Sequence, residues 1–226
     1  MALSTTRFLD RRDAGRRLAS ALREYARRTD VLVLGLPRGG VPVASEVASA
    51  LEAPLDVLVV RKLGVPGQDE LAMGAVASGG ITVLNREVIE HCRVTQDSID
   101  RVTQRELTEL ARRDLEYRGS APPLDVAGRT VIVVDDGLAT GATMSAAVAA
   151  LRVMRPLRIV VAAPVASRDA MRLLRRTADD CVSVSEPEPF YGVGQWYDDF
   201  AQTTDREVRR LLADSREPAP APALRS

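Results

Sequence analysis

The chain has 226 residues, a size that corresponds to one full domain with an added part rather than to two separate cores. Its 31 basic and 31 acidic residues cancel to a net charge of zero, which argues against binding to a nucleic-acid backbone or an anionic membrane. Hydrophobic residues make up 46% and charged residues 27%, ordinary globular proportions that exclude a disordered, collagen-like or disulfide-stapled protein.

Continuous apolar runs alternate with helical patterns along most of the chain. Such alternation is typical of an α/β fold whose parallel, twisted sheet is covered by helices on both faces. An amphipathic helix is expected at 10–28, within an N-terminal helical part at 1–30. Strands are expected at 31–35, 56–60, 130–134, 158–163 and 181–185, and the helices that follow them at 41–51, 142–154, 167–176 and 204–213.

The middle of the core, residues 75–120, is expected to be an insertion. Residues 75–78 and 81–84 flank two glycines like a hairpin, and 95–118 show a long helical pattern ended by Gly119. Before them, 63–74 is a polar, glycine-containing stretch that we interpret as a loop able to close over a substrate, with Gln68 and Glu70 as candidate contacts. The Pro/Ala tail at 215–226 lacks bulky apolar residues and is expected to be disordered.

Cysteine, histidine and hydropathy patterns indicate a cytoplasmic protein without a metal site of its own. Cys92 and Cys181 lie far apart without Cys-x-x-Cys spacing, so we expect reduced thiols. The N-terminus has no apolar run behind its arginines, and no stretch of about 18 apolar residues occurs, so neither secretion nor membrane spanning is expected. His91 is the only histidine, which excludes a metal site built on a histidine pair.

The most informative segment, 131–143, reads VIVVDDGLATGAT: a buried strand ends in two carboxylates and turns into the start of a helix. At 140–143, consecutive backbone N–H groups, two hydroxyls and the positive end of the helix dipole form a ready site for a phosphate monoester. Asp135 and Asp136 follow a parallel strand and can accept hydrogen bonds from a vicinal diol. Together they indicate ribose 5-phosphate; the alternative is a plain Asp-Gly turn with Thr143 capping the helix.

This segment resembles the phosphoribosyl-diphosphate (PRPP) binding motif of type I phosphoribosyltransferases. The resemblance implies the twisted parallel sheet of that family, with the core at 31–185 and a hood formed by the C-terminal segment at 186–214. It implies that the two acids bind the ribose hydroxyls and that the Thr-Gly-x-Thr loop binds the 5-phosphate. The donor-binding residues of the segment are then Asp135, Asp136, Gly137, Ala139, Thr140, Gly141, Ala142 and Thr143.

A second anion site is predicted where Arg38, Gly39 and Gly40 follow the first strand. In the family that the chain resembles, this loop binds the pyrophosphate of the donor; the alternative is a turn that needs glycine only for its backbone conformation. Arg61 and Lys62 end another predicted strand, and Lys62 is the only lysine among the 31 basic residues. We expect both to contact the donor and expect Lys62, Asp135 and Asp136 to act in catalysis, unless Lys62 is a chance surface residue.

Five of the eight aromatic residues lie between 190 and 200. In the resembled family a variable hood near the end of the chain contacts the acceptor base, and aromatic rings can stack on a base. Packing against the core or a second copy is the more common role of such clusters. The candidate acceptor contacts are Phe190, Tyr191, Trp196 and Tyr197.

The resemblance implies a Mg²⁺-dependent glycosyltransferase, more narrowly a pentosyltransferase of nucleotide metabolism, with PRPP as donor and an unidentified small acceptor. Mg²⁺ would enter on the phosphates of the donor, with Asp135 and Asp136 as contacts through water. Two alternatives stay open: a PRPP or nucleotide sensor without turnover, and a ribose-phosphate hydrolase or phosphorylase using the same pocket. The charged pattern at 95–118 also suits a partner helix, so a homo-oligomer is expected.

Overall fold

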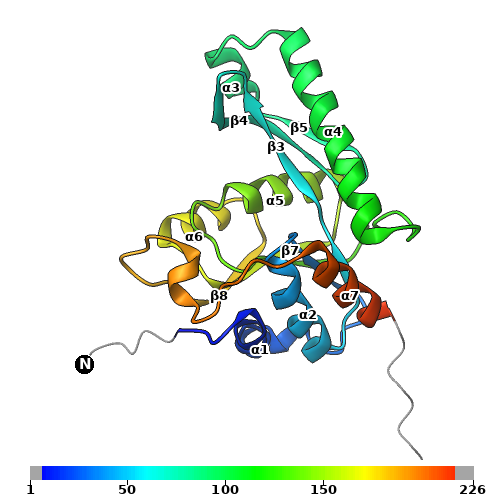
Figure 1. Ribbon diagram of the computed structural model, residues 1–226, viewed down its shortest axis with the longest axis vertical. Helices are drawn as coiled ribbons and strands as arrows, with labels where there is room; N and C mark the ends of the chain where they lie inside the picture. The colour runs from blue at the N-terminus through cyan, green and yellow to red at the C-terminus, as the bar shows by residue number, and fades with distance from the viewer. Residues whose placement is uncertain (1–6, 217–226) are drawn as a thin grey trace, which may run out of the picture.

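A five-stranded parallel sheet forms the centre of the molecule, as the sequence predicts (Figure 1). The computed structural model describes residues 7–216. Apolar residues fill the two central strands, so both faces of the sheet must be covered to remove them from water. The strands, in sheet order, are β2 (Leu55–Val57), β1 (Val31–Gly35), β6 (Thr130–Val134), β7 (Arg158–Val165) and β8 (Asp180–Ser185).

Successive residues of each strand pack against helices on opposite faces of the sheet. Val31 and Val33 belong to one buried cluster and Leu32 and Leu34 to the other, as the two-residue period of a strand requires. The first face is covered by α1 (Arg11–Ala21), α2 (Gly40–Leu51) and α7 (Asp205–Arg216). The second is covered by α5 (Ala142–Met154) and α6 (Arg168–Leu174).

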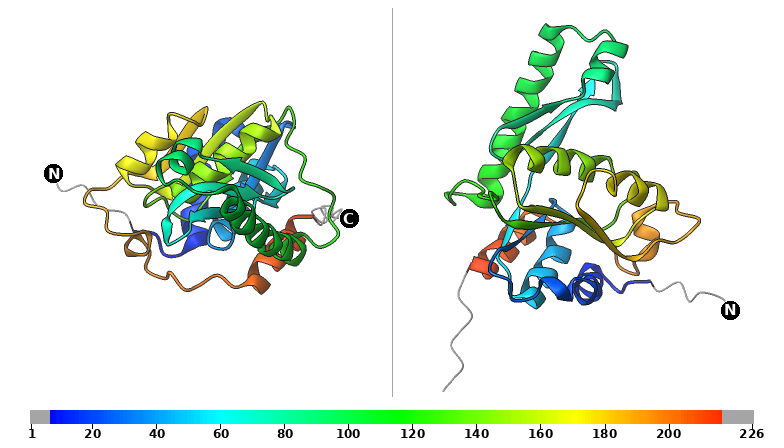
Figure 2. Two further views of the ribbon diagram at one scale, coloured as in Figure 1. Left: turned by 90° about the horizontal axis from the view of Figure 1, so that it is seen from above. Right: turned by 180° about the vertical axis from the view of Figure 1, so that it is seen from behind.

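Residues 60–118 form a second unit, which we call the arm, standing away from the main sheet (Figures 1 and 2). Its antiparallel sheet has its own small core with α4, because Leu63, Met73 and Val76 cluster with Ile99. The expected hairpin is confirmed, since Ala77 pairs with Ile81 and Gly74 with Leu84. The elements of the arm are β3 (Val60–Val65), β4 (Gln68–Ala77), β5 (Ile81–Leu84), α3 (Arg86–His91) and α4 (Gln96–Arg118).

Two expectations for the region before the hairpin are wrong. The stretch 63–74 is not a loop: β3 and β4 pair through it around a turn at Gly67, and Leu63 and Met73 are fully buried. Glycines interrupt the alternation of apolar side chains that is typical of a strand, and for this reason the sequence predicted a loop. The strand expected at 56–60 is also divided, since β2 ends at Val57 in the main sheet and β3 starts at Val60 in the arm. Gln68 begins β4, and the side chain of Glu70 lies outside the described part.

Both ends of the described chain differ from the expected boundaries. The N-terminal helix ends at Ala21 rather than at 28; a short 3₁₀ helix, η1 (Arg23–Tyr25), follows, and Arg27 then adopts a left-handed φ of 59°. The last helix, α7, continues to Arg216, past the expected end at 213. Residues 217–226 of the expected tail lie outside the described residues. Among the described helices, none is long and apolar enough to cross a membrane.

Candidate functional site

The loops that follow β1 and β6 pack against each other at the carboxyl end of the sheet. A Cβ added to Gly39 would lie 2.0 Å from Asp136 Oδ2, and one added to Gly40 would lie 2.6 Å from the Val134 carbonyl oxygen. Any larger residue would push the loops apart, so glycine is required at both positions for this close approach. The peptide bond between Pro37 and Arg38 is cis. The tertiary structure therefore brings together the two segments that the sequence suggested as ligand loops.

Asp136 is bound by residues from both ends of the chain. Arg11 of α1 donates from Nε to Asp136 Oδ2 at 2.8 Å, and both side chains are largely buried, at 12% and 15% exposure. The Arg11 guanidinium also donates to the Ala201 carbonyl oxygen at 2.7 Å and lies 4.0 Å from the centre of the Phe200 ring. The Tyr197 hydroxyl donates to the Asp136 main-chain oxygen at 2.5 Å. Sequence reasoning missed Arg11, because nothing distinguishes it from the other arginines around it.

The carboxyl group of Asp135 has a different environment. Its Oδ1 accepts a hydrogen bond from the Asp136 backbone N–H at 2.9 Å. Burial raises the pKa of Asp135 well above its usual value, and the adjacent Asp136 carboxylate raises it further. Burial also raises the pKa of Asp136, but Arg11 acts against that shift. The two acids therefore differ in their partners: Asp136 is paired with the Arg11 guanidinium, whereas Asp135 accepts from a backbone N–H.

The loop between β6 and α5 presents an exposed helix start. Gly141, at a φ of 74°, makes the turn that lets α5 begin at Ala142, and Thr140 Oγ1 accepts from the Ala142 backbone N–H at 3.3 Å. The loop is anchored to the residue before α6, because the Ser167 hydroxyl donates to the Ala139 carbonyl oxygen at 2.6 Å. The side chains of Thr140 and Thr143 stay accessible, so the loop can bind an anion as the sequence suggests. Gly137 packs against Val193, whose Cγ1 lies 2.4 Å from the Cβ position that glycine leaves empty.

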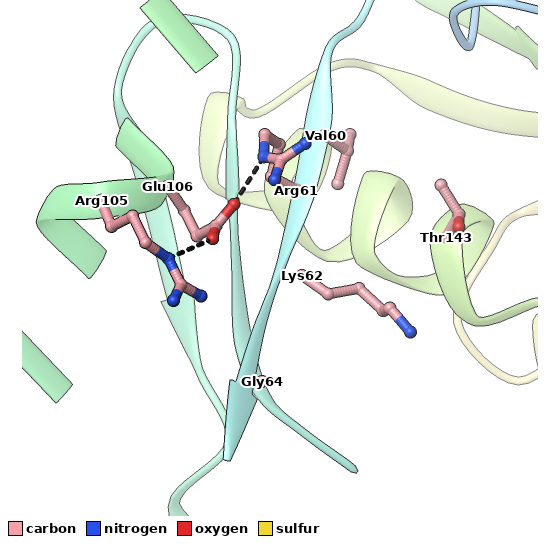
Figure 3. A pocket seen from close by; sticks show the side chains of 7 residues that line it. All are labelled: Val60, Arg61, Lys62, Gly64, Arg105, Glu106 and Thr143. Atoms are coloured by element: carbon pink, nitrogen blue, oxygen red, sulfur yellow. Dashed lines mark hydrogen bonds and ion pairs between the residues drawn. The ribbon is translucent and has the colours of Figure 1, made fainter. Parts of the chain in front are cut away.

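A cavity of about 270 Å³ lies between the arm and the start of α5 (Figure 3). Lys62 and Thr143 both line it, and Lys62 extends from β3 toward the helix that carries Thr143. Arg61 leaves the strand on the other side, where its Nε donates to Glu106 Oε2 at 2.5 Å. Lys62 is thus directed toward the proposed phosphate loop, whereas Arg61 is bound to a carboxylate of α4.

Arg38 is the first residue of the glycine loop, and its side chain points toward α7. Its Nη1 is 4.0 Å from Asp205 Oδ2 at the start of α7, and its side chain is 37% exposed. Asp205 Oδ1 accepts a hydrogen bond from the Tyr117 hydroxyl of α4 at 2.5 Å. Arg38 is therefore loosely held and accessible to an anion in front of the loop.

The aromatic residues expected to contact the acceptor divide into packed and exposed ones. Tyr197 is 2% exposed and its ring lies between Phe8, at 5.4 Å, and Phe200, at 5.0 Å. Tyr197 therefore has no free ring face for stacking, and for this residue the packing interpretation holds. Phe190 and Trp196 pair at 6.2 Å in the same cluster, whereas Tyr191 is 85% exposed.

The chain belongs to the phosphoribosyl transferase domain family, whose sequence model matches residues 4–199. It is 46% identical over 205 residues to a Mycobacterium tuberculosis H37Rv protein that carries a phosphoribosyl transferase name. That match covers 91% of this chain and 46% of the relative, so the chain spans less than half of the relative's length. The bifunctional protein PyrR of Roseiflexus sp. RS-1 is 32% identical, with 69% of this chain and 68% of that protein covered.

A solved structure shares the fold of this chain. The crystal structure of TT1426 from Thermus thermophilus matches with a TM-score of 0.84 and 44% identity, covering 92% of this chain and 98% of that one. Coverage on this scale includes the arm as well as the main sheet. The type I phosphoribosyltransferase-like fold expected from the segment at 131–143 is confirmed.

Proposed function

We propose that the protein transfers ribose 5-phosphate from PRPP to a nucleobase or related acceptor and releases pyrophosphate. The close packing of Gly39 against Asp136, beside the exposed threonine loop, carries this proposal. It supports the proposal because one loop that can bind a phosphate lies against two carboxylates that can bind a diol, and a second such loop follows these carboxylates in the chain. This set of groups suits a sugar that carries a phosphate group at each end.

Each group has a role that follows from its chemistry. The backbone N–H groups and hydroxyls at 140–143 would hold the 5-phosphate, and Asp135 and Asp136 would accept hydrogen bonds from the ribose hydroxyls. Breaking the bond between C1 and the pyrophosphate oxygen leaves positive charge on the sugar and negative charge on the leaving group. The N–H groups of the loop at 38–40, Arg38 and Lys62 would stabilise the leaving group, while the two acids lie near the sugar.

The donor set fits Mg²⁺ bound chiefly through the substrate. Mg²⁺ prefers oxygen ligands and keeps several waters, so Asp135 and Asp136 suit contact through water while the donor phosphates supply direct ligands. Within residues 7–216, no group of three or more His, Cys, Asp or Glu side chains forms a metal site independent of substrate. When bound, the metal would neutralise charge on the departing pyrophosphate.

Titration calorimetry of PRPP with and without Mg²⁺, followed by a pyrophosphate-release assay against a panel of nucleobases, tests the function. We expect Mg²⁺-dependent binding and release with at least one base. Asp135→Asn and Asp136→Asn together should abolish donor recognition. Binding without release with every base would favour the sensor, release without a base would favour the hydrolase, and the absence of binding would contradict the proposal.

The expected homo-oligomer and cytoplasmic location belong to the same proposal. Light scattering across a range of concentrations tests the first, and a monomer at all of them would contradict it. Fractionation of the native cells, followed by detection of the full chain, tests the second.

A further inference from the structure

Helix α4 contains a buried carboxylate, an unusual position for a charged residue in a mostly solvated helix. Glu106 is 5% exposed, whereas the neighbouring positions Arg105 and Glu109 are accessible. A carboxylate loses hydration on burial and is retained only when cations or donors replace the water. The sequence suggested a partner helix for this stretch, and a contact with another chain does not account for an acid that is already buried within this one.

Two arginines from different elements supply the partners of Glu106 (Figure 3). Arg61 of β3 donates from Nε to Oε2 at 2.5 Å, and Arg105 of α4 donates from Nε to Oε1 at 2.9 Å. A guanidinium carries five N–H donors, so a contact through Nε leaves the two outer nitrogens of each fork for other acceptors. Glu106 thus fixes the position of both guanidiniums without using all of their donors.

These residues line the same cavity as Lys62 and Thr143. Three basic residues, Arg61, Lys62 and Arg105, line the wall formed by the arm together with Glu106, which bonds two of them. The opposite wall carries the hydroxyl of Thr143 at the start of α5, which the proposed function assigns to the 5-phosphate, so the wall formed by the arm faces the 5-phosphate loop across the cavity. The cavity is therefore suited to a ligand with more negative charge than a single phosphate monoester.

We propose that Arg105 binds the diphosphate end of the donor together with Arg61 and Lys62, and that Glu106 is the positioning residue that holds the two guanidiniums. This inference rests on the proposed function and gives the arm a role in it. Because α4 supplies both residues, the arm is part of the donor site rather than only a surface for a partner.

Calorimetry with inorganic pyrophosphate and, separately, ribose 5-phosphate tests the role of Arg105, both with Mg²⁺ present. Arg105→Gln leaves the pair between Arg61 and Glu106 in place, and we expect about tenfold weaker pyrophosphate binding with ribose 5-phosphate binding unchanged. Arg113→Gln is the matched control, because Arg113 is on the same helix and donates to Glu109, outside the cavity. Unchanged pyrophosphate binding in Arg105→Gln, or an equal loss in the control, would overturn the inference.

Glu106→Gln distinguishes the positioning of the two guanidiniums from the electrostatic effect of the Glu106 charge on pyrophosphate binding. The substitution removes a negative charge from the cavity wall, so unspecific electrostatics would tighten pyrophosphate binding. An amide presents one acceptor and one donor group, so it can hold only one of the two arginines, and positioning instead predicts severalfold weaker binding. Glu109→Gln is the control, since Glu109 accepts from Arg112 and Arg113 in the same manner. Tighter binding in Glu106→Gln would overturn the positioning role.

The two proposals fail in distinguishable ways. If the unmodified protein binds neither PRPP nor ribose 5-phosphate, the proposed function fails and this inference fails with it. If the unmodified protein binds both sugars and pyrophosphate but Arg105→Gln matches it in pyrophosphate affinity, only the inference fails. Far-ultraviolet circular dichroism and a thermal melt of each variant establish that the fold is retained.

Discussion

Arg11 Nε and Asp136 Oδ2 lie 2.8 Å apart and join the N-terminal helix to the carboxyl end of the central strand. The pair makes two adjacent acids unequal, since Asp136 is bound to a cation and Asp135 is bound to a backbone N–H. Both members of the ion pair are largely buried, so neither is compensated by water if the other is removed. Substitution of Asp136 removes the counter-charge of a buried guanidinium and substitution of Asp135 does not, so the two acids should respond differently.

Asp136→Asn should destabilise the protein by about 2–3 kcal/mol, because the buried guanidinium of Arg11 loses its counter-charge. Urea denaturation at neutral pH measures the change. The double variant Arg11→Gln with Asp136→Asn should lose less than the sum of the two single variants, since the same interaction is removed once. Additive losses would mean that the pair contributes no coupling energy.

Asp135→Asn should instead raise thermal stability at neutral pH while abolishing donor binding. The folded-state pKa of Asp135 is raised above the value of 3.8 of an ordinary aspartic acid, so this carboxyl group lowers the stability of the folded state at neutral pH. That cost is absent below pH 3.8 and grows as the pH rises through the folded-state pKa. Removal of a cost of about 1 kcal/mol by the substitution would raise Tm by about 2–4 °C. Melting curves between about pH 4 and 7 check the trend, and a gain that shrinks toward neutral pH would contradict it.

Gly39→Ala should weaken PRPP binding by about tenfold or more and cost about 1–3 kcal/mol of stability, because the new Cβ would lie 2.0 Å from Asp136 Oδ2. Calorimetry and urea denaturation give the two quantities. Gly192→Ala is the stability control, since no atom lies within 4 Å of its Cβ position and its φ of 168° is extended backbone that alanine adopts. Equal stability of the two variants would show that the loops can separate without cost.

Lys62→Ala should lower kcat by about 10², with a much smaller effect on the dissociation constant of PRPP, if its ammonium acts mainly on the departing pyrophosphate. Steady-state kinetics combined with calorimetry separates the two effects. Lys62→Arg, which keeps the charge, should recover part of the rate. Full activity in Lys62→Ala would mean that Lys62 has no role in the reaction.

Local patterns predict the elements whose residues carry their own signal. The apolar run at 130–134 and the helix at 142–154 agree with β6 and α5 residue for residue, because a buried strand and a helix with a regular apolar pattern are encoded by neighbouring side chains. In the stretch at 63–74 glycines interrupt the strand pattern, and the burial of its apolar residues depends on α4, which is distant in the sequence. The same reason explains the buried Glu106, whose partner Arg61 lies on another element.

The sequence by itself determined the parallel sheet, the acid pair and the threonine loop, since the sheet follows from apolar runs that alternate with helices and the other two are short motifs with a fixed spacing. Only the tertiary structure decided which groups meet at the site: Gly39 against Asp136, Arg11 on Asp136, and Glu106 between Arg61 and Arg105. These contacts join residues from different elements of the fold. Their geometry depends on how helices and strands pack, which no local pattern of residues encodes.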